Sequence, residues 1–224
     1  MLFADRREAG ELLATRLAGY LGQQPLVFGI PRGGVIVAAP VAGRLGAPLD
    51  VVVPRKLTSP HNEELAIGAV AEDGTLYVDE TLVAYLGVTE DYLRREAAHQ
   101  IEEIKRRTAL YRHGRPAREV KDRTVILVDD GVATGYTVLA AMRYLRRQEP
   151  RQLILAVPVA APDTLIKLRE EADRVVVVSS PDPFYAVGQF YRQFAQTTDE
   201  EVIDLLEDGI GVSAVGHANP ELRT

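Results

Sequence analysis

The chain of 224 residues is 46% hydrophobic and 26% charged, and it carries a formal net charge of −6. This length and composition predict one sizeable α/β domain with a buried core, and they exclude disordered and fibrous classes. The acidic balance argues against general binding to nucleic acid or membrane surfaces, because such partners require a dominant basic field. The absence of cysteine excludes disulfides, cysteine-ligated zinc and thiol nucleophiles.

Apolar spacing and turn residues in the first half of the chain predict alternating helices and strands. The expected order is helix, strand, helix, strand over residues 5–21, 25–30, 35–45 and 49–53. A polar stretch with two prolines, residues 54–64, is predicted to be a loop. Two apolar runs within residues 65–78, separated by Glu72-Asp-Gly74, predict a hairpin. A long charged helix over residues 90–111 follows, and we expect its outer side to be a solvated face.

The second half of the chain continues the alternation. Strands and helices in turn are expected over residues 124–128, 137–147, 152–159, 163–171 and 174–179. Apolar strands alternating with helices predict a doubly wound, mostly parallel sheet that is covered on both faces. We expect a single domain over residues 1–207 and a glycine-rich, mobile tail over 208–224. The early charges and the lack of a stretch of roughly 20 apolar residues predict a cytoplasmic protein without a membrane span.

The segment from Val125 to Thr137 carries the strongest functional signal. Four apolar residues form a strand, Asp129 and Asp130 lie at its carboxyl end, and a small-residue turn then opens a helix. Such a turn at a helix N-terminus favours a phosphate, whereas the carboxylates would repel it and suit neutral hydroxyl groups. An isolated Asp-Asp-Gly would more simply cap a helix. The fixed order of strand, carboxylates and turn instead predicts a site for ribose 5-phosphate.

These thirteen residues resemble the ribose-phosphate signature of type I phosphoribosyltransferases, which use phosphoribosyl pyrophosphate (PRPP). The resemblance implies that Asp129 and Asp130 hold the ribose 2′- and 3′-hydroxyls. It also implies that the turn cradles the 5′-phosphate with residues Ala133, Thr134, Gly135, Tyr136 and Thr137. The implied fold is the doubly wound sheet with a small cap, or hood. We expect the hood to include the N-terminal segment, residues 60–116, residues 180–207, or a combination of these.

Two further segments match places where this family binds pyrophosphate. Gly29-Ile-Pro-Arg-Gly-Gly34 follows the first strand, and the resemblance implies that Arg32 and Gly33 contact pyrophosphate, across a strained or cis peptide. Without that context the segment would be an ordinary turn. The loop beginning at Arg55 and Lys56 corresponds to the family's mobile catalytic flap, and both side chains could neutralise the departing pyrophosphate. An ordinary charged surface loop is the competing interpretation.

The segment Ser180 to Gly188 is similar to the one in hypoxanthine-type enzymes where an aromatic ring stacks on the purine. By that correspondence Phe184 would cover the acceptor base, with Tyr185 as second choice, although such a ring is often simply part of a core. The match departs from the family by one extra residue before Gly188 and by the lack of an Asp after it. Ala133 also stands where enzymes for 6-oxopurines carry an Asp, which weakens a hypoxanthine or guanine assignment.

The resemblance therefore implies a transferase that binds PRPP and Mg²⁺ and acts on a nitrogenous base, as in nucleotide salvage. Asp129 and Asp130 would contact Mg²⁺ only indirectly, through ribose or water. A PRPP-binding regulatory protein without transferase activity is the alternative, although no basic arm or helix-turn-helix supports it. A dinucleotide-binding oxidoreductase is excluded because no Gly-x-Gly-x-x-Gly follows the first strand. Neither the acceptor base nor the oligomeric state follows from the residues, and a homodimer is one option in this family.

Overall fold

Five parallel strands form the central sheet of the computed structural model, which describes residues 1–211. They lie in the order β2-β1-β6-β7-β8. Their bounds are β1 Leu26–Gly29, β2 Leu49–Val51, β6 Thr124–Val128, β7 Gln152–Val159 and β8 Arg174–Ser179. The three inner strands are almost wholly buried, as expected when helices cover both faces of a parallel sheet.

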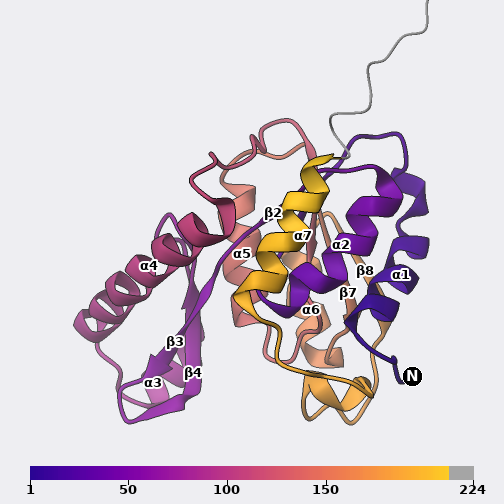
Figure 1. The fold of residues 1–224 in the computed structure, drawn as a ribbon. Helices are drawn as coiled ribbons and strands as arrows, with labels where there is room; N and C mark the ends of the chain where they lie inside the picture. Colours follow the sequence, from indigo (N-terminus) through magenta and orange to yellow (C-terminus); the bar gives the residue numbers. More distant parts are fainter. Residues whose placement is uncertain (212–224) are drawn as a thin grey trace, which may run out of the picture.

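Alternate residues of each strand enter two separate cores. Val27, Ile126 and Ile154 lie side by side and face one group of helices, namely α1 (Arg6–Arg16), α2 (Gly33–Leu45) and α7 (Asp199–Gly211). Their neighbours Phe28 and Leu127 face the opposite group, α5 (Tyr136–Arg146) and α6 (Pro162–Glu171). Figure 1 shows the first group in front of the sheet and the second behind it. The predicted doubly wound parallel sheet is confirmed.

The neighbouring strands β1 and β6 form the switch point of this sheet. The chain leaves β1 through α2 on one face, and it leaves β6 through α5 on the other face. The two connections therefore diverge at the carboxyl ends of adjacent strands, and such a crevice is where open α/β sheets bind ligands. Both segments that the sequence singles out, 29–34 and 125–137, meet at this point.

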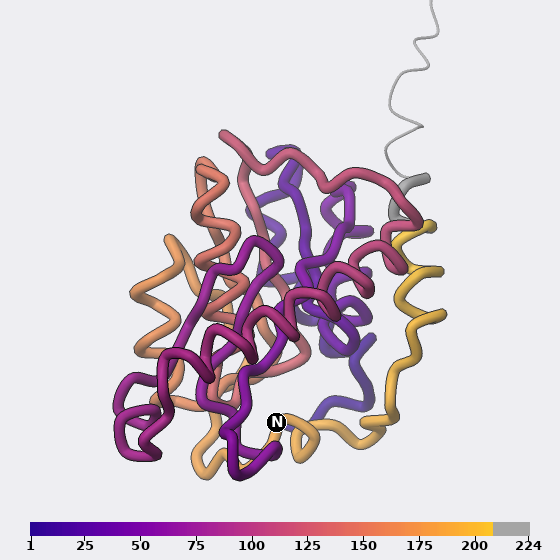
Figure 2. Tube along the Cα trace, turned by 90° about the vertical axis from the view of Figure 1, so that its left-hand side faces the viewer, coloured from indigo at the N-terminus to yellow at the C-terminus, as the bar shows by residue number. Residues whose placement is uncertain are grey.

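A small antiparallel sheet with two helices lies beside the main sheet (Figure 1), and we refer to this unit as the hood. It consists of β3 Arg55–Ser59, β4 Asn62–Val70, β5 Leu76–Val78, α3 Glu80–Tyr85 and α4 Glu90–Arg112. The long helix α4 runs diagonally across these strands in Figure 2. The predicted hairpin over 65–78 and the predicted long helix are confirmed, whereas α3 has no counterpart in the sequence-based expectations.

The prediction of a loop over residues 54–64 is wrong, because β3 and the start of β4 occupy it as a hairpin. Leu57 is fully buried and Ser59 is nearly so, whereas Lys56 at the neighbouring position is exposed. Register shifts on either side of Thr58 disturb the pairing. Polar residues and these bulges hide the two-residue alternation of a strand from inspection of the sequence.

The two ends of the chain also differ from expectation. The first helix ends at Arg16, and a short 3₁₀ turn, Ala18–Tyr20, replaces its predicted last turn. Helix α7 was not predicted; it packs with α2 and α4, and it reaches Gly211, into the predicted tail. The rest of that tail, from residue 212, lies outside the described residues. Within residues 1–211, no helix is both long enough and apolar enough to cross a membrane.

Candidate active site

The carboxylate pair at the end of β6 lies directly against the glycine turn at the end of β1. A Cβ atom on Gly33 would lie 2.0 Å from Asp130 Oδ2, and one on Gly34 would lie 2.9 Å from Asp129 Oδ1. Ordinary van der Waals contacts begin at 3.4 Å, so the two loops can approach this closely only because both positions are glycine. The structure thus brings together the two segments that the sequence proposes as ribose and pyrophosphate sites.

The electrostatics of the pair favour a ligand that donates hydrogen bonds. Burial and the negative charge of Asp130 raise the pKa of Asp129 well above its usual range. Burial also raises the pKa of Asp130, but the hydrogen bond and charge of Arg6 oppose that increase. The backbone N–H of Asp130 donates to Asp129 Oδ1 at 2.9 Å, and this bond does not involve Asp129 Oδ2. Hydroxyl groups or a cation near these oxygens would relieve the repulsion between the two charges.

The predicted phosphate turn begins with two residues that are open to solvent, and α6 anchors it. Ala133 and Thr134 are exposed, and Thr137 is half-buried. Gly135 has φ of 80° and precedes α5, and a Cβ there would lie 2.6 Å from Thr164 Cγ2. Thr164 Oγ1 donates to the carbonyl of Ala133 at 2.5 Å and so fixes the turn to α6. The first N–H groups of α5 have no partners within the helix and can face an anion.

Tyr136 in the same turn points its side chain away from solvent and into the hood. Its ring stacks on Tyr77 with centroids 5.7 Å apart, and its hydroxyl donates to Asp79 Oδ2 at 2.7 Å. Burial and this hydrogen bond raise the pKa of Tyr136. Only the backbone of Tyr136 is therefore available for the predicted phosphate contact, and its side chain ties the turn to the hood.

The two basic residues of the predicted flap point to opposite sides, because consecutive residues of a strand alternate. Arg55 Nε donates to Gln100 Oε1 on α4 at 3.0 Å. Lys56 is exposed on the other side, where its ammonium group is near enough to lower the pKa of Asp129 against the effect of burial. The structure brings Lys56 toward the carboxylate pair and directs Arg55 to α4.

Arg32 lies in the glycine turn directly before Gly33, and it faces the N-terminus of α7. Its Nη1 lies 3.8 Å from Asp199 Oδ1, an atom that also accepts a 2.6 Å hydrogen bond from the hydroxyl of Tyr111. Burial and the bond to Asp199 raise the pKa of Tyr111 to about 12. The peptide bond between Pro31 and Arg32 is cis. The sequence did not indicate Asp199 or Tyr111 as neighbours of this site.

The N-terminal segment and residues 190–193, which lie within ranges that the sequence analysis allowed for the hood, form a wall on the other side of the site. The N–H of Phe3 donates to the carbonyl of Phe190 at 2.8 Å, so the N-terminal segment runs beside residues 190–193 (Figure 2). The hydroxyl of Tyr191 donates to the carbonyl of Asp130 at 2.5 Å, and burial raises the pKa of this tyrosine. Arg6 Nε donates to Asp130 Oδ2 at 2.7 Å. No local motif marks these residues, because they contact the carboxylates only after the chain folds.

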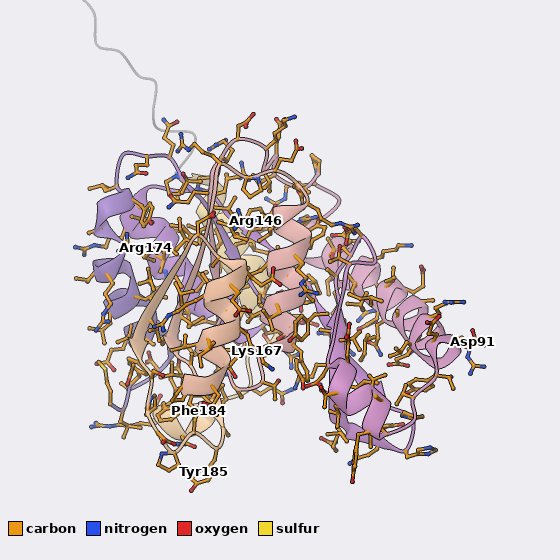
Figure 3. All side chains as sticks on the ribbon, turned by 180° about the vertical axis from the view of Figure 1, so that it is seen from behind. Asp91, Arg146, Lys167, Arg174, Phe184 and Tyr185 are labelled. Atoms are coloured by element: carbon orange, nitrogen blue, oxygen red, sulfur yellow. The ribbon has the colours of Figure 1, made fainter. Side chains whose placement is uncertain are left out.

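The aromatic segment after β8 lies at the same edge of the sheet. Phe184 is half-buried, and its ring centroid is 4.9 Å from that of Phe190. Tyr185 is 82% exposed and lies at the outer end of this segment in Figure 3. A Cβ on Gly131 would lie 2.5 Å from Val187 Cγ1, so the aromatic segment packs on the loop of the carboxylate pair. Phe184 is thus near the candidate site but belongs partly to a small core.

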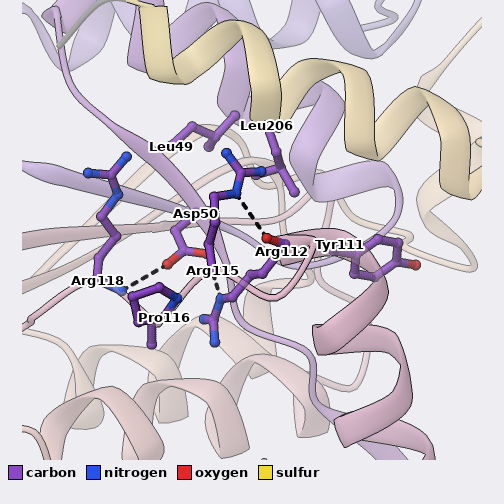
Figure 4. A pocket seen from close by; sticks show the side chains of 9 residues that line it. Leu49, Asp50, Tyr111, Arg112, Arg115, Pro116, Arg118 and Leu206 are labelled. Carbon is purple, nitrogen blue, oxygen red and sulfur yellow. Dashed lines mark hydrogen bonds and ion pairs between the residues drawn. The ribbon is translucent and has the colours of Figure 1, made fainter. Parts of the chain in front are cut away.

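Two cavities of about 370 Å³ lie at opposite edges of the sheet. The first adjoins the carboxylate pair and is lined by Arg6, Arg32, Gly33 and residues 194–197. The second, shown in Figure 4, is lined by Asp50, Arg112 and the segment 115–118, which precedes β6. In it, buried Arg112 donates to Asp50 Oδ1 at 2.9 Å and to the carbonyl of Val51. That ion pair fastens the end of α4 to β2, and the second cavity is separate from the candidate site.

The parallel sheet with its small antiparallel sheet is the fold of the phosphoribosyltransferase family. The chain belongs to the family of the phosphoribosyl transferase domain, whose model matches residues 4–195. Proteins of Mycobacterium tuberculosis strains H37Rv and CDC 1551, whose names assign them provisionally as phosphoribosyl transferases, are 42% identical over 206 residues. That match covers 92% of this chain and 46% of theirs, so the chain spans about half the length of these curated relatives.

Two solved structures are similar to this chain in fold. The crystal structure of the protein TT1426 from Thermus thermophilus is similar with a TM-score of 0.79 and 46% identity, over 93% of this chain and 99% of that one. A hypothetical protein of Neisseria gonorrhoeae, solved with bound ppGpp, has a TM-score of 0.50 at 14% identity, over 93% of this chain and 95% of that one. The latter likeness shows the fold alone. The predicted family and its fold with a hood are confirmed.

Proposed function

We propose that this protein binds PRPP with Mg²⁺ and transfers the phosphoribosyl group to a nitrogenous base, with release of pyrophosphate. The observation that carries the proposal is the half-buried pair Asp129 and Asp130, which lies between an open phosphate turn and the glycine turn at Gly33. Hydroxyl acceptors beside a helix N-terminus suit a ribose 5-phosphate, and the cavity next to Arg32 offers room for a diphosphate.

The residues would act mainly by positioning and by charge. Asp129 and Asp130 accept hydrogen bonds from the ribose hydroxyls, and the N–H groups of residues 134–137 bind the 5′-phosphate. The bond from the anomeric carbon to pyrophosphate breaks first, and its electron pair leaves on the pyrophosphate oxygen. A nitrogen lone pair of the base then forms the new bond, and the nitrogen's proton passes to solvent. Arg32 and Lys56 offset the negative charge that develops on the leaving group.

The donor set near the site suits Mg²⁺ held largely by substrate and water. Residues 1–211 contain no group of three or more His, Asp or Glu side chains arranged to hold a metal. The carboxylates of Asp129 and Asp130 supply hard oxygen atoms, which Mg²⁺ prefers, and it commonly keeps several waters. When bound, the ion would neutralise charge on the departing pyrophosphate.

The acceptor is a nitrogenous base that Phe184 can flank. Ala133 offers no carboxylate to the base, and this argues against 6-oxopurines that need a proton acceptor at that position. The half-buried ring of Phe184 supports an aromatic acceptor that stacks on it.

A PRPP-binding regulatory protein without transfer is the second candidate. It is favoured by the hydrogen bond of Arg55 to Gln100 on α4, because a side chain held there does not reach over the leaving pyrophosphate. Pyrophosphate release distinguishes the two functions, since a regulator would bind PRPP without releasing pyrophosphate.

Isothermal titration of PRPP with Mg²⁺ tests the site, followed by a pyrophosphate-release screen over nucleobases. The D129N/D130N double variant should abolish PRPP binding and remain folded. The D91N/D122N variant is a matched control, because both of its aspartates are exposed and its charge change is the same. Unchanged PRPP affinity in D129N/D130N would refute the site. Binding without release for any base would favour the regulator.

A further inference from the structure

Arg6 is the one side chain of the first helix that reaches the carboxylate pair among the contacts of residues 1–211. It begins α1, which is capped by Asp5 through a 2.9 Å hydrogen bond from the N–H of Glu8. Phe3 lies shortly before this helix, where its N–H donates to the carbonyl of Phe190 and its carbonyl accepts from the N–H of Arg192. The backbone of Arg6 is thus held on both sides, so its side chain enters the site from a fixed position.

Three contacts orient the guanidinium group of Arg6. Nε donates to Asp130 Oδ2 at 2.7 Å, Nη1 donates to the carbonyl of Ala195 at 2.8 Å, and the group lies 3.8 Å above the ring centre of Phe194. Its side chain is only 13% exposed. In the described part of the chain, no hydrogen-bond acceptor is paired with Nη2. A guanidinium held flat by a ring and a carbonyl therefore retains an amino group that can still donate.

The position of Arg6 relative to the glycine turn gives that remaining amino group a role. A Cβ on Gly33 would lie 2.6 Å from Arg6 Nε and 2.0 Å from Asp130 Oδ2. Arg6 and Arg32 line the same cavity of about 370 Å³ together with Gly33. A diphosphate in this cavity would lie next to the carboxylate of Asp130, and the two anions would repel unless a cation lies between them.

We propose that Arg6 is a diphosphate-binding residue of the site, with Nε on Asp130 and Nη2 on a diphosphate oxygen. The planar guanidinium group can donate hydrogen bonds to two anions at once, and the compact ammonium group of a lysine does this less well. The inference rests on the proposed PRPP site and adds to it a residue from outside the sequence motifs. In this proposal Arg6 bridges the carboxylate of Asp130, which holds the ribose, and the pyrophosphate, which is the leaving group.

The test measures the binding of three ligands, each with Mg²⁺: PRPP, inorganic pyrophosphate and ribose 5-phosphate. Arg6→Gln should weaken PRPP and pyrophosphate by about 10- to 100-fold, as expected for loss of a charged hydrogen bond. The affinity of Arg6→Gln for ribose 5-phosphate should stay within about threefold of the wild-type value, because a larger change would correspond to the loss of a hydrogen bond. Arg6→Lys should lie between Arg6→Gln and wild type, because it keeps the charge and loses the fork.

Arg7→Gln is the matched control, because Arg7 is the next residue of α1 and is exposed. It should bind all three ligands as the wild type does. Equal weakening of ribose 5-phosphate and pyrophosphate in Arg6→Gln would overturn the proposal, since Arg6 would then act only through Asp130. The proposal would also be overturned if Arg6→Gln bound PRPP and pyrophosphate as tightly as the wild type does. A wild-type protein that binds no PRPP would instead refute the proposed function. If Arg6→Gln does not fold, Arg6→Lys carries the same comparison.

Discussion

A methyl group at Gly33 is the smallest change that tests how closely the two loops of the site must approach. In Gly33→Ala the new Cβ would lie 2.0 Å from Asp130 Oδ2, whereas ordinary contacts begin at 3.4 Å. The carboxylate or the turn must therefore move by the difference, 1.4 Å. Arg6 Nε, which would lie 2.6 Å from the same Cβ, must move as well. The change thus acts on the carboxylate and on its cationic partner together.

The expected effect is large on binding and moderate on stability. A displacement of about 1 Å in a reacting site can cost about 100-fold, so we expect PRPP affinity to fall by about that factor. Crowding of a packed site typically costs about 1–3 kcal/mol. For a domain of this size, each kcal/mol lowers the melting temperature by about 2–4 °C. Isothermal titration and thermal unfolding by circular dichroism measure the two effects.

Gly43→Ala provides the control within the same helix. A Cβ at Gly43 meets nothing within 4 Å, and the position is exposed. Because alanine is the better helix former, this variant should be stabilised by about 0.5–1 kcal/mol and should bind PRPP normally. If Gly33→Ala binds PRPP within about threefold of the wild type, the close approach of the two loops is not needed for binding, and this reasoning fails.

Three further predictions concern the buried ion pair at the end of α4 and two residues of the candidate site. Arg112→Met leaves the carboxylate of Asp50 buried without its cation, so the free energy of unfolding in urea should fall by about 3–5 kcal/mol; a loss below about 1 kcal/mol contradicts this. Asp129→Asn should stabilise the ligand-free protein more at pH 7 than at pH 4. In the folded protein the pKa of the Asp129 carboxyl is raised, so this carboxyl ionises at lower pH in the unfolded chain than in the folded one. Ionisation of Asp129 therefore destabilises the fold as pH rises above about 4. An equal gain in stability at pH 4 and pH 7 would refute this prediction. Tyr136→Phe should cost about 1 kcal/mol by losing the bond to Asp79 and leave PRPP affinity within about threefold; a larger loss of affinity would mean that the hydroxyl contacts the ligand.

Local signals in the sequence were enough to predict the framework of the site. The strand Thr124–Val128, its two carboxylates and the turn before α5 are contiguous, so apolar runs and turn residues reveal them without knowledge of the fold. The strands β7 and β8 were predicted with their observed bounds for the same reason. The roles of Ala133 to Thr137 and of Phe184 in binding remain predictions.

Signals that depend on packing were misread or missed. Residues 54–64 were predicted as a loop because Arg55, Lys56 and Thr58 are polar, yet Leu57 is buried and the segment pairs with β4. The opposite directions of Arg55 and Lys56 follow from that strand and could not be predicted for a loop.

The sequence by itself determined the strands of the main sheet and the helices between them, the family signature and the two carboxylates of the candidate site. Only the tertiary structure decided what surrounds those carboxylates. Arg6 and Asp130 are 124 residues apart, and Arg32 precedes α2 whereas Asp199 begins α7, so no local pattern relates them. The physical reason is that strand periodicity and turn chemistry are local, whereas the neighbours of a buried charge are set by how separate elements pack.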